Sequence, residues 1–287
     1  SPQSGMGQAD IVYEALTEAG ITRFLALFSE IGEGTPAADR LGSVRSARHY
    51  FVSFADEYDA IFVHFGETTY AAKKMKKLKI DHITGMYGAG VASFYRDKSI
   101  KAPHNAFASL EGIEKAVERE GIRTEYEEGY ESHFRFYAQD TDILAEEGMQ
   151  EATGLTLGFS AYTSPYFTYD KDTKLYTRYQ FGGVHTDYNT GGALTFKNLI
   201  IQLVDEWNID KNGYQTMDIE DASGTGYYLT NGVCVPVTWK KKEETRFMRY
   251  YGQDGEELTI NPGRTYIAVF PQNREKYITI GQEGQAH

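Results

Sequence analysis

The densest group of residues able to do chemistry is the segment 42–50, which reads Gly-Ser-Val-Arg-Ser-Ala-Arg-His-Tyr. We expect a helix to begin near Ser46, and small residues ahead of a helix can present free backbone N–H groups to an anion. Arg45 and Arg48 would then lie on one side of its first turn, where the helix dipole disfavours positive charge. A phosphate or carboxylate between the two arginines would relieve that cost. The alternative is that both arginines pair with nearby acids, namely Asp39, Asp56 or Asp59.

Two histidines could act as acid–base groups. His64 stands near the end of the apolar run 60–65 and before Gly66, a position outside the carboxyl end of a strand where α/β proteins place ligands. It could be a general base or a metal ligand. His104 follows Pro103, which restrains the backbone and could fix the imidazole. A structural role, with the ring held by one hydrogen bond or a turn, is the alternative for each histidine.

A further polar group lies at the end of the stretch 85–105, which has glycines at 85, 88 and 90 and no clear periodicity. We expect a long loop here, and long loops inside compact domains are often functional. Arg96, His104 and Asn105 supply a cation, an imidazole and an amide. A structural turn is the other interpretation of the same residues.

His185 and Asp187 are two residues apart in a segment that reads as extended, so their side chains point the same way. The pair could bind a metal with a third ligand from elsewhere, or Asp187 could orient a histidine. The third ligand would be one of three residues, His64, His104 or Glu67. Because no HExxH or other closely spaced ligand motif is present, we predict no metal and no cofactor.

Composition limits the classes of partner. The formal net charge is −12 and the sequence pI is near 5.1, which argues against nucleic acid, because affinity for nucleic acid comes from Lys and Arg. It does not exclude a locally basic pocket. The single cysteine, Cys234, excludes an intrachain disulfide and a thiolate zinc cluster, and its apolar neighbours predict a buried side chain. No run approaches the roughly 18 to 20 apolar residues of a membrane span.

The first half of the chain alternates helices with short apolar strands. Helical spacing of apolar residues predicts helices at 8–19, 46–58, 68–78 and 109–120. Short apolar runs predict strands at 21–28 and 60–65, and glycines with charged residues predict a loop at 31–42. This alternation indicates an α/β layered domain over residues 1–150.

The second half, residues 151–287, is rich in Tyr, Thr, Val and Gly and reads as a β-rich domain. Asn231-Gly232 lies between two strand-like runs and is a strong hairpin signal, because both turn positions need positive φ. Strands are predicted at 198–207 and 265–270. Further turns are predicted at residues 170–172, 254–255 and 261–263. The predicted fold class is therefore α+β, with an N-terminal α/β layered domain followed by a β-rich C-terminal domain.

Long, ordered motifs carry a family resemblance. In the first half they are residues 2–14 (PQSGMGQADIVYE), 20–24, 44–48 with 50–51, and 95–96 with 103–105. In the second half they are Tyr176 with Arg178, His185 with Asp187 and Asn198, and 261–263 with Thr265. Over nearly its whole length the chain resembles the YerB-like bacterial lipoproteins, a two-domain family of unknown function.

The resemblance implies an extracytoplasmic protein, lipid-anchored to the outer face of the cytoplasmic membrane, with no established activity. The family's lipobox and the short strand before its first motif are absent from this sequence, so we expect a processed or trimmed N-terminus. The resemblance adds Arg178 to the candidate positions. Gly42-Ser43 stands where the family has Gly-Pro, so the loop before Arg45 should be less rigid than in its relatives.

These observations lead to one main hypothesis and two alternatives. The main hypothesis is a cell-envelope binding protein whose N-domain cleft holds an anionic ligand, such as a polymer phosphate or a carboxylated glycan. The alternatives are an envelope hydrolase or transferase that uses His64 or His104 as acid or base, and a structural protein that docks a partner through its β-rich half. The candidate ligand-binding residues are Arg45, Arg48, Arg96, His104, Asn105, Arg178, His185 and Asp187.

Overall fold

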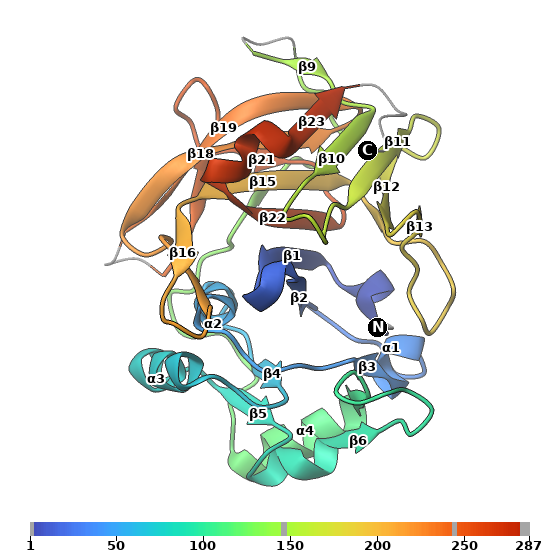
Figure 1. Ribbon diagram of the computed structural model, residues 1–287, viewed down its shortest axis with the longest axis vertical. Coiled ribbons are helices and arrows are strands. Elements are labelled where there is room, and N and C mark those ends of the chain that lie inside the picture. Colours follow the sequence, from blue (N-terminus) through green and yellow to red (C-terminus); the bar gives the residue numbers. More distant parts are fainter. Residues whose placement is uncertain (1–2, 145–147, 243–245, 282–287) are drawn as a thin grey trace. The chain divides into compact units, whose positions relative to one another are not determined.

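The computed structural model describes residues 3–144, 148–242 and 246–281. Its fold is α+β, as predicted, with the helices in the N-terminal part and a β-rich C-terminal part (Figure 1). The chain forms two compact units. Unit 1 comprises Ser1–Ala9, Phe28–Ser132 and Thr186–Gly192, and unit 2 comprises Asp10–Leu27, His133–His185 and Ala193–His287. Compactness in the folded state does not show which segments fold alone, so the domain boundary at residue 150 stays a prediction.

Unit 1 contains the α-helices and two small sheets. The helices are α1 (Pro36–Asp39), α2 (His49–Asp56), α3 (Thr69–Leu78) and α4 (Leu110–Glu120). One sheet is antiparallel, in the order β3 (Leu41–Gly42), β7 (Ala106–Ala108), β6 (Phe94–Arg96). The other pairs β4 (Phe62–His64) in parallel with β5 (His82–Thr84). Two 3-10 segments are η1 (Met6–Gln8) and η3 (Ala89–Ser93).

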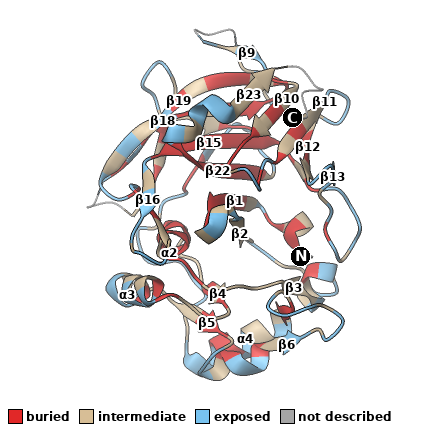
Figure 2. Ribbon diagram, viewed as in Figure 1, coloured by how far each residue is buried: buried red, intermediate tan, exposed pale blue. Residues whose placement is uncertain are grey.

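Local capping signals explain where the two longest helices begin and end. Before α3, Thr68 Oγ1 accepts a hydrogen bond from Ala71 N at 3.1 Å. Before α4, Ser109 Oγ accepts one from Gly112 N at 3.2 Å. The chain leaves α4 through Gly121, whose φ of 67° suits a residue without a side chain. The sequence predictions for both helices are confirmed, and Figure 2 shows their exposed faces in pale blue.

Helix α2 begins at His49, three residues later than predicted. Its N-cap is Arg48, which has an extended backbone with φ −116° and ψ 147°. The preceding segment is held in strand-like pairing, with Ala47 N donating to Gly66 O at 2.8 Å. Arg45 therefore lies ahead of the helix, and the prediction that the two arginines share its first turn is wrong.

Unit 2 is built on a large mixed sheet in the order β2-β1-β22-β15-β18-β19-β20, with β9 also paired to β19. The strands are β1 (Ile11–Leu16), β2 (Thr22–Leu27), β9 (Gln150–Glu151), β15 (Asn198–Val204), β18 (Ala222–Thr230), β19 (Val233–Lys241), β20 (Arg249–Tyr251) and β22 (Thr265–Pro271). Strand β22 runs parallel to both β1 and β15. Every residue of β15 and β22 is buried, which Figure 2 shows in red.

A second sheet of unit 2 runs in the order β13-β12-β11-β10-β23, with β14 also paired to β12. Its strands are β10 (Gly154–Leu157), β11 (Tyr166–Asp170), β12 (Leu175–Gln180), β13 (Gly183–Val184), β14 (Thr195–Phe196) and β23 (Ile278–Gly281). The two sheets pack through aromatic rings, since Phe167 of β11 lies 4.9 Å from Tyr266 of β22 between ring centres. Smaller pairs are β16 (Glu206–Asn208) with β17 (Gln215–Met217), and β8 (Arg135–Phe136) with β21 (Thr259–Ile260).

The predicted helix at 8–19 is wrong, because its apolar residues form β1. Helical spacing fits this run, but a short apolar run cannot be told from a buried strand by periodicity alone. β1 pairs antiparallel with β2 on one edge and parallel with β22 on the other. Its burial pattern leaves only Ile11 partly exposed. Gly20 ends the 3-10 turn η2 (Glu18–Gly20) between β1 and β2, with φ 71°.

Two predicted loops contain short elements. The stretch 31–42 includes α1 and β3, and the stretch 85–105 includes η3 and β6. In the first, Thr35 Oγ1 accepts from Ala38 N and Pro36 occupies the first helical position, which together suffice for a single turn. In the second, β6 forms because its partner β7 follows the stretch and supplies the backbone hydrogen bonds.

The Asn231-Gly232 hairpin is confirmed. The two residues join β18 to β19, with Thr230 opposite Val233, and their φ values are 50° and 77°. A Cβ on Gly232 would lie 2.9 Å from Cε1 of Tyr169, so glycine is required both for the backbone conformation and for space.

Candidate functional site

Arg45 and His104 were predicted as separate candidates from the sequence, and in unit 1 they contact each other. Arg45 Nη1 lies 2.7 Å from His104 Nδ1, so the guanidinium donates to an unprotonated ring nitrogen. Burial lowers the pKa of Arg45, and the neighbouring Arg48 guanidinium lowers it further. A cation in surroundings that disfavour its charge is stabilised by a nearby anion.

Arg96 and Asn105 form a second contact, which the chain joins to the first. Arg96 Nη1 donates to Asn105 Oδ1 at 2.8 Å, and Asn105 directly follows His104 in the chain. Phe65 links the two arginines, because its N donates to Arg45 O at 3.1 Å and its ring centre lies 4.9 Å from the Arg96 guanidinium. Together Arg45, Arg96, His104 and Asn105 form what we call the basic cluster.

Neither arginine of the basic cluster pairs with a carboxylate anywhere in the described residues. The adjacent acid, Asp97, is occupied, because its Oδ2 lies 3.0 Å from Arg40 Nη1. Asp59, one of the acids weighed as a partner of Arg45, instead accepts a hydrogen bond from Arg123 at 2.7 Å. The two arginines of the basic cluster therefore carry positive charge that no carboxylate among the described residues neutralises.

Arg48 has a different environment from Arg45. Its residue is only 6% exposed, and its Nη1 donates to Ser46 O at 3.1 Å and Ala47 O at 3.2 Å. The guanidinium thus binds backbone carbonyls of its own segment. It acts on Arg45 through charge.

His64, the last residue of β4, is buried and its imidazole contacts that of His82, the first residue of β5. Its Nδ1 is 2.8 Å from Gly66 O and its Nε2 is 3.0 Å from His82 Nδ1. Burial is the largest influence on both rings and lowers the pKa of His64 and of His82. Glu67 Oε2 is 3.6 Å from His64 Nδ1, beyond hydrogen-bond distance. His64 is only 1% exposed.

Arg178 and His185 belong to a buried charge network in unit 2. Arg178 Nη2 donates to Glu14 at 2.8 and 3.1 Å, and both side chains are 0% exposed. Arg178 Nη1 lies 2.5 Å from His185 Nδ1, and Tyr266 donates to Glu14 at 2.6 Å. Burial, then the Arg178 charge, lowers the pKa of His185 to about 3. The network connects β1, β12 and β22 inside the unit.

Asp187 organises backbone in unit 1. Its carboxylate accepts hydrogen bonds from Gly7 N at 2.7 Å, Asn189 N at 2.8 Å and Gly5 N at 3.3 Å. The side chain of Asn189 in turn donates to Arg40 O at 2.9 Å. Across the described ranges, no group of three or more His, Cys, Asp or Glu is arranged to hold a metal ion.

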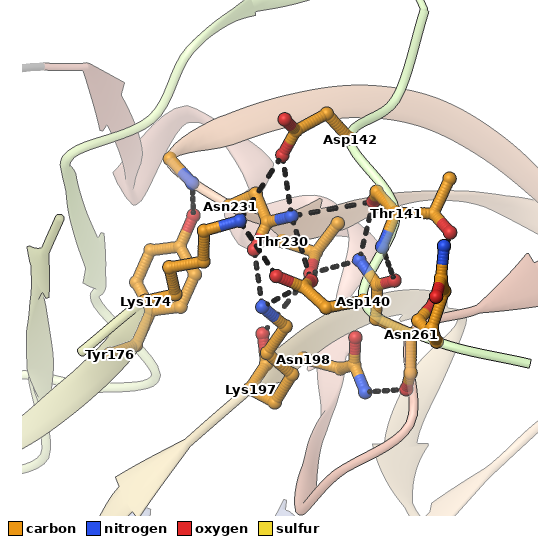
Figure 3. Close-up of polar contacts among 12 residues, drawn as sticks. Asp140, Thr141, Asp142, Lys174, Tyr176, Lys197, Asn198, Thr230, Asn231 and Asn261 are labelled. Carbon is orange, nitrogen blue, oxygen red and sulfur yellow. Dashed lines mark hydrogen bonds and ion pairs between the residues drawn. The ribbon is translucent and has the colours of Figure 1, made fainter. Parts of the chain in front are cut away.

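A dense polar network that the sequence did not reveal surrounds Asp140 in unit 2 (Figure 3). Asp140 lies 2.7 Å from Lys174 and 2.6 Å from Lys197, and it accepts a hydrogen bond from Asn231 at 3.0 Å. Lys197 also donates to Asn231 Oδ1. Burial would raise the pKa of the Asp140 carboxyl, but these three donors together hold it well below its ordinary range.

Asn261 extends this network to the segment after β8. Its side chain both accepts from Thr141 N at 2.8 Å and donates to Thr141 O at 2.9 Å, as a strand partner would. Asn198 Nδ2 donates to Asn261 O at 2.7 Å, and Tyr228 donates to Asn198 at 2.8 Å. Because most donors and acceptors here are paired within the chain, the network is suited to holding residues 140–142 against the β18–β19 hairpin.

The fold and these clusters define a two-domain α+β protein with a basic cluster in unit 1 and buried polar networks in unit 2. Residues 1–123 match the family model described as "Protein of unknown function (DUF3048) N-terminal domain", and residues 155–267 match the corresponding C-terminal domain. The chain therefore belongs to the DUF3048 family, which confirms the resemblance seen in the sequence.

Relatives agree with this assignment over nearly the full chain. The chain is 32% identical over 285 residues to "Putative lipoprotein YerB" of Bacillus subtilis (strain 168), covering 98% of this chain and 80% of that protein. A crystal structure of the YerB protein from Bacillus subtilis matches with a TM-score of 0.82 and 30% identity, covering 98% of this chain and 89% of that one. In the part of the chain that the structure describes, no helix is long and apolar enough to cross a membrane.

Proposed function

We propose that this protein is an extracytoplasmic, lipid-anchored envelope protein that binds an anionic ligand through Arg45 and Arg96. The observation that carries the proposal is that two guanidinium groups, hydrogen-bonded to the consecutive residues His104 and Asn105, have no carboxylate partner among the described residues. Guanidinium groups bind phosphate and carboxylate oxygens through paired N–H donors. The name of the Bacillus subtilis relative, a putative lipoprotein, supports the envelope location.

The electrostatics of the cluster favour an anion over a neutral ligand. Burial and the neighbouring Arg48 both lower the pKa of Arg45, so a bound negative charge would stabilise its charged form. The protein as a whole carries a formal charge of −12, so local positive charge is not a general property of its surface. A ligand with spaced anionic groups, such as a polymer phosphate or a carboxylated glycan, would be attracted to the cluster and repelled elsewhere.

Titration calorimetry with two defined probes tests this proposal. The probes are a glycerol phosphate oligomer and an oligogalacturonate, which carry phosphate and carboxylate groups respectively. We expect Arg45→Gln with Arg96→Gln to weaken binding of at least one probe by about tenfold or more, since charge-assisted hydrogen bonds contribute roughly 1.5–3 kcal/mol each.

The matched control is Arg119→Gln, which removes the same charge from an exposed position on α4 of the same unit. It should leave binding within about twofold, because an exposed charge acts mainly through a screened field. If the control loses as much affinity as the double variant, the loss comes from the change in net charge and not from these two arginines, which would refute the proposal. No binding of either probe, or binding untouched by the double variant, would refute the proposal.

A further inference from the structure

A pocket of about 500 Å³ lies within unit 2, apart from the residues of the basic cluster. Its walls come from the end of β1, the β16–β17 hairpin, the end of β22 and the 3-10 segment η4 (Gln272–Tyr277). This volume is in the range of pockets that hold a small organic ligand. The residues that line it include a carboxylate, three amides, two cations and two aromatic rings.

Glu206 is the unusual group in this pocket. Its Oε2 is buried and has no hydrogen-bond partner among the described residues. Burial raises the pKa of the Glu206 carboxyl to about 7, and no cation offsets that effect. A buried carboxyl oxygen without a donor costs free energy in the unliganded protein. A ligand that brings an N–H or O–H group would satisfy it.

The two cations of the pocket are directed at Tyr277. The Arg274 guanidinium lies 4.4 Å from the centre of the Tyr277 ring, and Arg274 Nε donates to Gly158 O at 2.9 Å. Lys276 Nζ lies 5.1 Å from the same ring centre. These positive charges disfavour a cationic ligand, while the carboxylate of Glu206 disfavours an anionic one. A neutral ligand with hydrogen-bond donors is consistent with both.

Trp207 supplies an exposed ring to the lining of the same pocket. Its residue is 52% exposed although it is large and apolar, and it neighbours Glu206 on β16. Asn208 and Gln215 face each other across the hairpin, where Gln215 Nε2 donates to Asn208 Oδ1. The pair therefore offers a ligand Asn208 Nδ2 as a donor and Gln215 Oε1 as an acceptor. A sugar ring has an apolar C–H face for an aromatic ring and equatorial hydroxyl groups for carboxylate and amide partners.

We propose that this pocket binds a neutral sugar ring of a glycan, stacked on Trp207 with a hydroxyl or acylamino group donating to Glu206. The chemistry differs from that of the basic cluster, which selects negative charge. A negative result for one proposal therefore leaves the other unaffected.

Tryptophan fluorescence gives a direct readout of this site. The chain has two tryptophans, and the other one, Trp239, is only 2% exposed and donates to Leu203 O at 2.9 Å. A ligand that stacks on Trp207 should therefore cause a saturable fluorescence change and protect the chain from quenching by acrylamide. The probes are oligomers of N-acetylglucosamine and of glucose, with spermidine as a cationic comparison.

Calorimetry with the same probes then tests the two named residues. Trp207→Ala and Glu206→Gln should each weaken sugar binding about tenfold, as expected for losing one stacking or charge-assisted contact. Tyr162→Ala is the control, since Tyr162 is 73% exposed but does not line the pocket. It should bind as the unmodified chain does, and circular dichroism checks that every variant is folded.

Saturable binding of either sugar probe that is weakened by both pocket variants supports the proposal. Three results overturn it. The first is the absence of a saturable signal with both sugars, and the second is sugar binding that both variants retain. The third is a signal produced by spermidine and by neither sugar, which would make the occupant a cation.

Discussion

Replacing Glu14 with glutamine should strongly destabilise unit 2. The carboxylate is 0% exposed and accepts hydrogen bonds from Arg178 at 2.8 and 3.1 Å, from Tyr266 at 2.6 Å and from Thr22 at 2.6 Å. Glutamine offers one acceptor oxygen and no charge, so Arg178 would remain as a buried cation without its counter-ion. Removing one partner of a buried ion pair costs about 3–5 kcal/mol, and we expect a loss of unfolding free energy in that range.

Urea unfolding followed by tryptophan fluorescence measures this loss in the correct unit, because Trp207 and Trp239 both belong to unit 2. With a slope of about 3 kcal/mol/M, the midpoint should fall by about 1 M or more. The control is Arg135→Gln, which breaks a 3.1 Å pair with Glu257 whose arginine side chain is 64% exposed. That change should cost less than about 1 kcal/mol, as surface pairs do.

The double variant Glu14→Gln with Arg178→Met separates the pair from its surroundings. It should lose less stability than the sum of the two single variants, because the second change removes the cation that the first leaves unpaired. A loss below about 1 kcal/mol for Glu14→Gln alone, or strictly additive losses, would refute the reasoning that this network is held by mutual charge compensation.

Three further changes have defined outcomes. Burial and Arg178 lower the folded-state pKa of His185 from 6.5 to about 3, so its contribution to stability is complete above about pH 6.5 and is lost as pH falls toward 3. In His185→Gln the urea midpoint should therefore change less between pH 7 and pH 4 than it does in the unmodified chain. An equal change of the midpoint with pH in both proteins would contradict this. Gly232→Ala should cost about 1–3 kcal/mol in the same assay, since φ is positive and the added Cβ meets Tyr169; an unchanged midpoint would contradict it. Burial raises the pKa of the Glu206 carboxyl from 4.5 to about 7, so stability falls as pH rises from about 4.5 and the loss is complete above about 7. Glu206→Gln should therefore stabilise the protein by about 3 kcal/mol at pH 8 and little at pH 4. An equal effect at both pH values would exclude the buried carboxyl as the cause.

Structure that depends on neighbouring residues was predictable from the sequence. Thr68, Ser109 and Gly121 cap α3 and α4 through contacts within a few residues, so their sequence pattern determines the helix ends. The same holds for Asn231-Gly232, whose φ values are set by the two residues themselves. Cys234 is buried, as its apolar neighbours indicated.

Structure that depends on distant residues was not predictable. Glu14 lies within the stretch 8–19 that was predicted to be a helix, and its partner Arg178 is 164 positions away in the sequence. Likewise Arg45 and His104 were each named as candidates, yet their contact across 59 positions has no local signal. Asp140 and Glu206 went unnoticed because a single acid among polar residues has no pattern. Only the assembled sheets show that one is surrounded by lysines and the other is unpaired.

The position of β22 has a consequence for how the protein is made. Thr265 pairs with Ile11 and with Asn198 at once, so the last long strand inserts between two earlier ones. During synthesis β1 and β2 emerge before β22, so β1 keeps an open edge until residues 265–271 arrive. Open edges invite pairing with other chains, so the growing chain is exposed to aggregation until residues 265–271 have been made. A chain that ends before residue 265 lacks the strand that joins β1 to β15, so its large sheet cannot form as one piece.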